Sequence, residues 1–319
     1  MPAEWEPHAA TWIAWPHNRA DWPGRFAPIP WVYGEIVRKL AAVERVRILT
    51  QNDAAERQAR RVLEKAGANL DAVEFFHRET DRVWTRDYCP LFVKNRRGEM
   101  ALASWRFNGW AKYPNHTRDA AVPAFLAKRL KLPAFTPGMV LEGGSIDVNG
   151  AGLLLTTEEC LLSEVQQRNP GMSREQVEAR LREFLGVRQV IWLKTGIAGD
   201  DTHGHVDDLA RFVDAETVAL VADADPADAV TLRRAGLKVV RLPMPRPLVF
   251  DGVRVPASYA NFYIANGLVL VPTFNDPNDR AALNTLAKLF AGREVVGINC
   301  TELIWGLGAL HCMTQQQPA

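Results

Sequence analysis

The sequence predicts an α/β fold in which one structural unit recurs along a single catalytic domain of residues 1–319. Amphipathic, helix-like segments alternate with short apolar, strand-like segments from end to end. A pair of strand-like segments precedes most helices, so that the order hairpin, helix, strand recurs at intervals of roughly 50 residues. Since no low-complexity linker divides the chain, we expect repeated α/β units around a common centre. An open doubly wound sheet is the alternative, but the hairpins between the helices weaken it.

Six helices are expected, and several have recognisable ends. A helix begins at Asp53 and stops at Gly67. Another begins at Ser173 with Gln176 three positions later, which is the spacing of a capping box. A third has Asp225 as its N-cap, followed by proline at the first helical position. The six segments lie at 31–43, 53–67, 119–132, 173–186, 225–236 and 276–292.

Hairpins are expected between these helices. Two of them contain Asn-Gly between alternating apolar runs, which is a strong local signal for a hairpin turn. They are "SIDVNGAGLLLT" at 145–156 and "FYIANGLVLVPTF" at 262–274. Two more strand pairs are formed by 89–95 with 100–107 and within 209–223.

Composition excludes several classes of function. The formal net charge of +1 gives no electrostatic reason to expect nucleic acid or an acidic membrane as a partner. No apolar run approaches the roughly 18 residues of a membrane helix, and the N-terminus shows no signal peptide. The cysteines are widely spread and form no CxxC pair, which favours free thiols in the cytoplasm. They are Cys89, Cys160, Cys300 and Cys312.

Two short stretches combine acidic residues with turn signals. In "VWTRDYCP", Arg86 and Asp87 stand between a polar segment and an apolar strand. A surface ion pair at a strand end explains them as well as a functional site does. In "LEGGSIDV", two glycines after Glu142 permit close backbone approach or a tight bend entering a strand. The acid could therefore face a cavity.

The stretch "GDDTHGHVDDLARF" at 199–212 has the strongest functional signal, because packing does not explain so many Asp and His residues. In one interpretation, His203, His205 and Asp207 bind metal, as in the similar motif of metallo-β-lactamase-type hydrolases. That motif ends in a third His, whereas this chain has Asp208 at that position. In the other interpretation, His205 and Asp207 share one strand face, as an acid/base and a cation-binding carboxylate.

Cys312 lies near the end of the chain in "GALHCMTQQ". A lone cysteine is most often a small buried hydrophobic residue. Here His and Asp residues elsewhere could act with it. Gly306 and Gly308 precede it at alternating positions, which suggests a strand edge with room for a ligand. If so, the neighbouring His311 points to the opposite face and takes no part.

The combination of a thiol, a histidine and two carboxylates suits a cationic substrate. A thiolate needs an electrophilic carbon, and a histidine can protonate the leaving group and later activate water. Beside a neutral amide, the carboxylates would only disfavour the thiolate. A guanidinium is permanently charged, matches carboxylates through its fork of N–H donors and favours the attacking thiolate. The residues therefore indicate a guanidine hydrolase with a covalent thiouronium intermediate.

The chain also resembles the agmatine deiminase and Porphyromonas-type peptidylarginine deiminase family, within the guanidine-modifying pentein superfamily. The resemblance covers nearly the whole chain. The matching motifs are "MPAEWEPHAATWIAWPHN", "WTRDYCP", "WRFNGW", "LEGGSIDVNG", "LLTTEECLL", "GDDTHGHVDDLARF", "YANFYIANGLVLVPTF" and "HCMTQQQP". The family implies a fivefold pseudosymmetric α/β propeller of ββαβ repeats, with no metal and no organic cofactor.

The resemblance also implies roles for individual residues. Cys312 resembles the family's nucleophile and His205 its general acid/base. Asp87 and Asp207 resemble the carboxylates that bind the guanidinium, and Glu142 resembles a further site residue. The remaining substrate-binding candidates are Trp84 and Arg106, from the "WTRDYCP" and "WRFNGW" motifs.

Departures from the family pattern concern the tail of the substrate. Leu307 and Ala309 interrupt a glycine-rich stretch that usually contains Asn, and Cys89 stands where glycine is usual. If Arg106 faces the pocket, it repels the ammonium of agmatine and favours a carboxylate. Its alternative is a solvent-facing strand residue.

The leading expectation is a cytoplasmic hydrolase of the polyamine pathway that converts agmatine to N-carbamoylputrescine and ammonia. Deimination of another guanidine, such as arginine, peptidyl-arginine or a carboxylate-bearing compound, is the second hypothesis. A metallohydrolase that uses the cluster around His205 is the third. A guanidine-binding protein without turnover is the fourth. The partner in each deiminase hypothesis is a small guanidine, and homo-oligomerisation stays open.

Overall fold

The computed structural model describes all 319 residues, which fall into two compact units. The first unit comprises Met1–Glu4 and Arg86–Leu242, and the second comprises Trp5–Thr85 and Pro243–Ala319. The short helix α3 (Thr85–Tyr88) stands where the chain passes from the second unit to the first. None of the helices has the length and apolar composition that crossing a bilayer requires.

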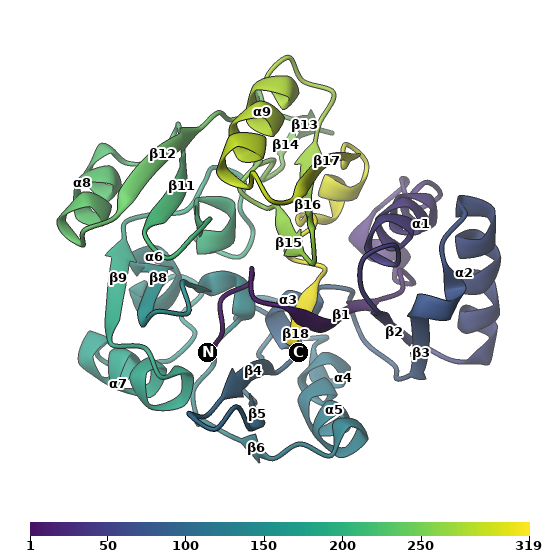
Figure 1. Cartoon of the computed structure of the whole chain (residues 1–319), viewed down its shortest axis with the longest axis horizontal. Helices are drawn as coiled ribbons and strands as arrows, with labels where there is room; N and C mark the ends of the chain where they lie inside the picture. The colour runs from purple at the N-terminus through teal and green to yellow at the C-terminus, as the bar shows by residue number, and fades with distance from the viewer. The chain divides into compact units, whose positions relative to one another are not determined.

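The first unit contains three modules of one kind (Figure 1). Each begins with an antiparallel hairpin, continues through one or two helices, and ends with a strand parallel to the second hairpin strand. The strands are β4 (Leu91–Lys94), β5 (Met100–Ala103) and β6 (Ala134–Phe135); β7 (Asp147–Val148), β8 (Leu153–Thr157) and β9 (Gln189–Leu193); and β10 (Ala210–Phe212), β11 (Thr217–Val221) and β12 (Lys238–Leu242). The helices are α4 (Thr117–Ala120), α5 (Val122–Leu130), α6 (Glu158–Leu162), α7 (Arg174–Leu185) and α8 (Pro226–Arg234), with 3-10 turns η3 (Gly143–Ser145) and η4 (Val206–Asp208).

The second unit contains two modules with the same order of pairing. The strands are β18 (Gln315–Pro318), β1 (His8–Ala14), β2 (Val46–Thr50) and β3 (Val73–His77) in one sheet and β15 (Tyr263–Ala265), β16 (Leu268–Thr273) and β17 (Glu294–Asn299) in the other. The helices are α1 (Ile29–Leu40), α2 (Asp53–Ala66) and α9 (Asp279–Leu289); η1 (Arg19–Asp21), η2 (Leu70–Ala72), η5 (Leu303–Gly306) and the hairpin β13 (Val249–Phe250) with β14 (Val253–Arg254) complete it.

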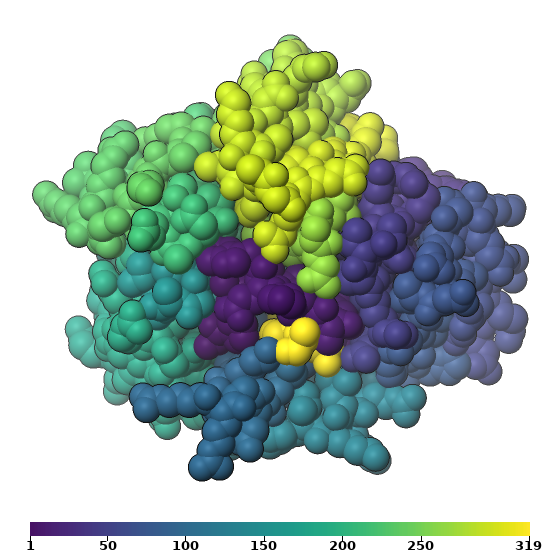
Figure 2. All heavy atoms as spheres, in the orientation of Figure 1, coloured from purple at the N-terminus to yellow at the C-terminus, as the bar shows by residue number.

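One module joins the two ends of the chain. Strand β18 pairs antiparallel with β1, with Trp12 opposite Gln315. The backbone N–H of Ala319 then donates to the carbonyl of Pro7 at 2.8 Å. Figure 2 shows the last residues, in yellow, beside the purple N-terminal strand. The segment that carries Cys312 is therefore held at its far end by pairing with the N-terminal strand.

Local signals in the sequence produce the expected element ends. Ser173 and Gln176 form both bonds of the capping box, and Asp225 caps α8 with Pro226 at the first helical position. Gly67 ends α2 in the left-handed conformation at φ +74°. The predicted hairpins form as well, with Asn266 and Gly267 making the two-residue connection between β15 and β16.

The prediction of a strand through His205 and Asp207 is wrong. His205 precedes η4, and β10 begins only at Ala210. The reason is local, because the Asp200 carboxylate accepts hydrogen bonds from the backbone N–H of Gly204 and of His205. Gly204, at φ +96°, supplies the bend that this turn requires.

The predicted strand edge before Cys312 is also wrong. The chain from Ala309 to Thr314 is a turn, with the N–H of Met313 bonded to the carbonyl of Ala309, and the strand begins at Gln315. Leu307 takes the left-handed conformation at φ +68°, which an extended edge excludes. His311 and Cys312 are therefore not separated by the alternation of a strand.

Candidate active site

Four of the predicted residues lie together in the first unit, and their side chains are almost completely buried: Asp87, Glu142, His205 and Asp207. They come from α3, from the residue before η3, and from both sides of the start of η4. Short turns present them, and no regular strand does. Turns let side chains from three separate segments converge on one point.

Gly144 lies at the centre of this cluster. A Cβ atom on this residue would lie 2.6 Å from Nδ1 of His205, 2.9 Å from Oδ1 of Asp87 and 3.0 Å from Oδ2 of Asp207. These distances are shorter than ordinary van der Waals contacts. The second glycine of the "EGG" stretch is therefore required by close approach and not by its φ angle.

Asp87 is held by two donors. The backbone N–H of Gly144 donates to Oδ1 at 3.0 Å, and the indole N–H of Trp110 donates to Oδ2 at 2.9 Å. Burial raises the pKa of Asp87 to about 6; His205 and Trp110 oppose this rise, whereas Asp207 and Glu142 add to it. A cation that comes close to Asp87 would therefore stabilise its ionised form and lower its pKa.

Glu142 is a buried carboxylate with a permanent positive partner. Nε of Arg168 donates to its Oε1 at 3.1 Å, and neither side chain is exposed. Burial alone would raise the pKa of Glu142, but Arg168 and His205 lower it to about 2. Glu142 therefore stays ionised, and its charge is already compensated before any substrate arrives.

His205 stands between these carboxylates. Its Nδ1 lies 3.9 Å from Oδ1 of Asp87 and 4.0 Å from Oδ1 of Asp207, and its Nε2 lies 3.6 Å from Oε2 of Glu142. Burial lowers the pKa of His205, but Asp87, Cys160 and Glu142 outweigh this effect and raise it well above its usual value. The ring is thus an imidazolium, which can donate a proton to a leaving group.

Cys312 lies in the second unit and is 7% exposed. The amide Nδ2 of Asn261 donates to its Sγ at 3.1 Å. The Oδ1 of the same side chain accepts the backbone N–H of His311 at 2.9 Å. An N–H donor aimed at sulfur stabilises a thiolate, and the backbone bond fixes the turn that carries it. This geometry suits a nucleophile.

Trp84 also lies in the second unit, next to the same segment. Trp84 is 5% exposed, and the centroid of its ring lies 5.8 Å from that of Trp22. A Cβ on Gly308 would lie 2.8 Å from a ring atom of Trp84. Trp84 therefore packs directly against the chain four residues before Cys312.

The structure does not bring the Arg106 side chain to the carboxylate cluster. Arg106 is exposed, and its backbone forms a parallel bridge with Val140. Arg86, beside Asp87 in the sequence, is buried and pairs with Glu4 at 3.3 Å. The two arginines of these motifs thus have different surroundings, and neither forms an ion pair with Asp87.

The metal ligands suggested by the sequence do not converge. The ring of His203 bonds Ser163 at 3.1 Å and lies 3.8 Å from Glu159, away from the partners of His205. A different trio in this unit has its donor atoms within 4.8 Å of one another: Glu142, Cys160 and His205. The guanidinium of Arg168 already occupies one oxygen of Glu142, so a cation there would meet charge repulsion.

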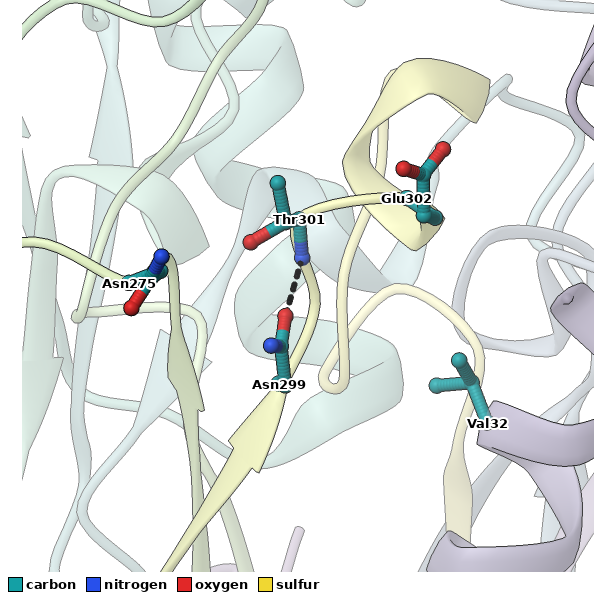
Figure 3. A pocket seen from close by; sticks show the side chains of 5 residues that line it. All are labelled: Val32, Asn275, Asn299, Thr301 and Glu302. Carbon is teal, nitrogen blue, oxygen red and sulfur yellow. Dashed lines mark hydrogen bonds between the residues drawn. The ribbon is translucent and has the colours of Figure 1, made fainter.

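A pocket of about 370 Å³ lies elsewhere in the second unit (Figure 3). It is lined by Val32, Asn275, Asn299, Thr301 and Glu302. Figure 3 shows the backbone N–H of Thr301 bonded to the side chain of Asn299, at 3.0 Å. None of the predicted site residues lines it, and it presents neither a nucleophilic thiol nor a histidine.

Sequence reasoning missed the residues that support the predicted ones. Trp110 bonds Asp87, Arg168 bonds Glu142, and Asn261 bonds Cys312. Trp110 stands inside the "WRFNGW" motif, so its motif membership was an available signal. Asn261 stands inside the "YANFYIANGLVLVPTF" motif, so the same signal was available for it. Arg168 lies in none of the matching motifs and carries no comparable signal.

Comparisons with known proteins identify the family of this chain. The family model for Porphyromonas-type peptidyl-arginine deiminase matches residues 1–318. The agmatine deiminase of Stutzerimonas stutzeri is 35% identical over 100% of this chain and 95% of its own length. That of Pseudomonas putida KT2440 is 36% identical with the same coverage.

Solved structures give the same result. A cysteine-to-serine variant of the C. jejuni agmatine deiminase with substrate bound superimposes with a TM-score of 0.90, at 29% identity, over 100% of this chain and 96% of the other. The agmatine deiminase of Enterococcus faecalis gives 0.91 at 31% identity, over 100% and 95%. An amidinotransferase from Microseira wollei, at 9% identity and a TM-score of 0.57, shares the fold alone. The chain therefore belongs to the Porphyromonas-type peptidyl-arginine deiminase family.

Proposed function

We propose that this chain hydrolyses agmatine to N-carbamoylputrescine and ammonia. The observation that supports it most directly is the pair of buried carboxylates, Asp87 and Asp207, which lie 2.9 and 3.0 Å from the position of a Cβ on Gly144. The charge of Glu142 is already balanced by Arg168. Burial raises the pKa of Asp87, so a bound cation would stabilise its ionised form. A guanidinium supplies that charge and offers N–H donors to both carboxylates.

In the proposed mechanism, Asp87 and Asp207 hold the guanidinium, and the Cys312 thiolate adds to its central carbon. His205 gives its proton to one nitrogen, the C–N bond breaks, and ammonia leaves. The remaining thiouronium is attacked by water, whose proton passes to His205. The C–S bond then breaks and the remaining hydroxyl proton is lost to solvent, which releases the neutral ureido product and restores the thiolate.

We further propose that the ββαβ modules form a fivefold pseudosymmetric propeller and that residues 1–319 act as one catalytic domain. The repeated pairing order in both units supports this arrangement. We place the enzyme in the cytoplasm and in putrescine biosynthesis. Free, buried cysteines support the first assignment, because a reducing compartment keeps thiols unpaired.

A substrate panel tests the proposed function. Ammonia release is measured with agmatine, free arginine, a peptidyl-arginine and a guanidino acid of similar length, and the products are identified by mass spectrometry. We expect agmatine to have the highest kcat/KM. The mass of its product should show that one C=NH group has been replaced by C=O. A preference of tenfold or more for another guanidine would reassign the substrate, and no turnover with any of them would leave only a binding function.

A further inference from the structure

The segment 163–172 joins α6 to α7 and contains none of the predicted site residues. Its Arg168 is nevertheless buried, with each guanidinium nitrogen engaged. Nε donates to Oε1 of Glu142 at 3.1 Å, Nη1 donates to the carbonyl of Gln166 at 2.9 Å, and Nη2 donates to the carbonyl of Thr202. A planar guanidinium bonded at all three nitrogens is held in one orientation.

The next residue, Asn169, holds the backbone near Glu142. Its Oδ1 accepts the N–H of Val140 at 2.8 Å, and its Nδ2 donates to the carbonyl of Val140 at 2.8 Å. The amide thus pairs with the main chain two residues before Glu142 as a strand would. Neighbouring residues of one loop therefore fix Glu142 through its side chain and through its backbone.

The second carboxylate oxygen of Glu142, Oε2, faces His205. This oxygen and the Nε2 of His205 are buried, have no hydrogen-bond partner, and face each other as an ion pair at 3.6 Å. A carboxylate is planar, so a bond to Oε1 from Arg168 determines where Oε2 points. The ring of His205 is in turn set by this oxygen on one side and by Asp87 on the other.

We infer that Arg168 is a positioning residue for the proposed deiminase reaction, acting through Glu142 to hold the imidazole of His205 in its working orientation. Among the four residues of the cluster around Gly144, Arg168 bonds Glu142 alone. Its effect on the reaction must pass through the carboxylate. This requirement separates it from a residue that only stabilises the fold, because the effects of Arg168 and Glu142 on turnover then become non-additive.

A double-mutant cycle tests this inference. Steady-state kinetics with agmatine are measured for Arg168→Gln, Glu142→Gln, the double variant and Arg168→Lys. Arg180→Gln is the matched control, because it removes an arginine from an exposed ion pair with Glu183 in the same unit. Since a group that orients a catalytic side chain is typically worth about 10- to 100-fold, we expect Arg168→Gln to lower kcat by that factor. We expect KM to stay within about twofold.

The double variant should be as slow as Glu142→Gln alone, and Arg168→Lys should recover part of kcat. Multiplying effects in the double variant, or wild-type kcat in Arg168→Gln, would overturn the inference. If Arg168→Gln does not fold because it leaves a buried carboxylate unpaired, the Lys and double variants carry the test. Wild-type kcat in both would then overturn it.

The inference rests on the proposed function, and a second readout separates the two. The ring ¹⁵N resonances of His205, assigned by their loss in His205→Gln, report on its contact with Glu142 without any turnover. We expect them to shift in Arg168→Gln and to remain unchanged in Arg180→Gln. Unshifted resonances refute the positioning role whatever the substrate, whereas a wild-type enzyme inert toward agmatine refutes the proposed function alone.

Discussion

The backbone N–H of Gly144 donates to Oδ1 of Asp87 at 3.0 Å, and a Cβ on Gly144 would lie 2.9 Å from that same oxygen. The glycine thus binds the carboxylate through a contact that leaves no room for a side chain. We expect Gly144→Ala to displace Asp87 or the His205 ring and to lower kcat/KM about 100-fold or more, the usual cost of misplacing a reacting group by about 1 Å. Steady-state kinetics with agmatine measure it.

Gly292→Ala is the control for this substitution. Nothing lies within 4 Å of a Cβ at Gly292, and its φ is not in the left-handed region. We expect it to retain wild-type kcat/KM and an unchanged melting temperature. Wild-type activity in a folded Gly144→Ala protein would show that the close approach around Asp87 and His205 has no bearing on the reaction.

The indole of Trp110 provides the second prediction. Its N–H donates to Oδ2 of Asp87, and a hydrogen bond to a charged group contributes about 1.5–3 kcal/mol. Trp110→Phe keeps an aromatic ring and removes this donor. We expect KM for agmatine to rise about tenfold or more, with a smaller effect on kcat, because in the proposed mechanism Asp87 binds the substrate in both the ground and the transition state.

Trp105→Phe is the matched control, since Trp105 belongs to the same stretch, is buried in the core, and has an indole N–H without a hydrogen-bond partner. It should leave KM unchanged. Equal KM values in the two variants would mean that the Trp110 donor does not support substrate binding.

Much of the fold could be predicted because its signals are local. The capping box at Ser173, the proline at the start of α8 and the Asn-Gly turn before β16 each act within a few residues. The errors at His205 and Cys312 have a different origin. Their turns are set by an acceptor on Asp200 and by the distant side chain of Asn261, which alternation of residue types does not report.

The reactive residues of the site could be predicted because their residue types occur in recognisable clusters in the sequence. The combination of Cys312, His205 and buried carboxylates suggested a cationic substrate from charge alone. Their supporting residues could not be found in this way. Arg168 lies 26 positions from Glu142, and Asn261 lies 51 positions from Cys312, so only folding brings each pair into contact.

Cys312 gives the third prediction. We expect Cys312→Ala to lower kcat by a factor on the order of 10⁴ or more, because removal of a nucleophile abolishes the covalent route. Iodoacetamide should modify the wild-type enzyme once, at Cys312, and inactivate it, as peptide mass spectrometry and residual activity will show. Excess agmatine should protect the thiol by occupying the site.

The remaining thiols are the internal control. Burial raises the pKa of Cys89, Cys160 and Cys300, so they are neutral thiols at neutral pH and react slowly. Cys300→Ala should therefore keep the labelling and full inactivation. Inactivation that follows labelling of another cysteine, or ammonia release at the wild-type rate by Cys312→Ala, would refute the nucleophile assignment.

The last prediction concerns pH, through Asp87. Burial raises the pKa of Asp87 to about 6, so this carboxylate binds a proton at a pH where an ordinary aspartate is still charged. The protonated form cannot pair with a guanidinium. We therefore expect kcat/KM for agmatine to rise through pH 6, to level off about one pH unit above it, and to fall up to tenfold per unit below it. In the bound complex the cation favours the carboxylate, so the acid limb of kcat should lie at lower pH than that of kcat/KM.

Asp228 is the control for assigning this limb, because burial also raises its pKa to about 6. It lies in the first turn of α8, where it accepts the backbone N–H of Lys194. Asp228→Asn should leave both limbs in place, whereas loss of the limb in that variant, or a wild-type limb near pH 4, would contradict the role given to Asp87.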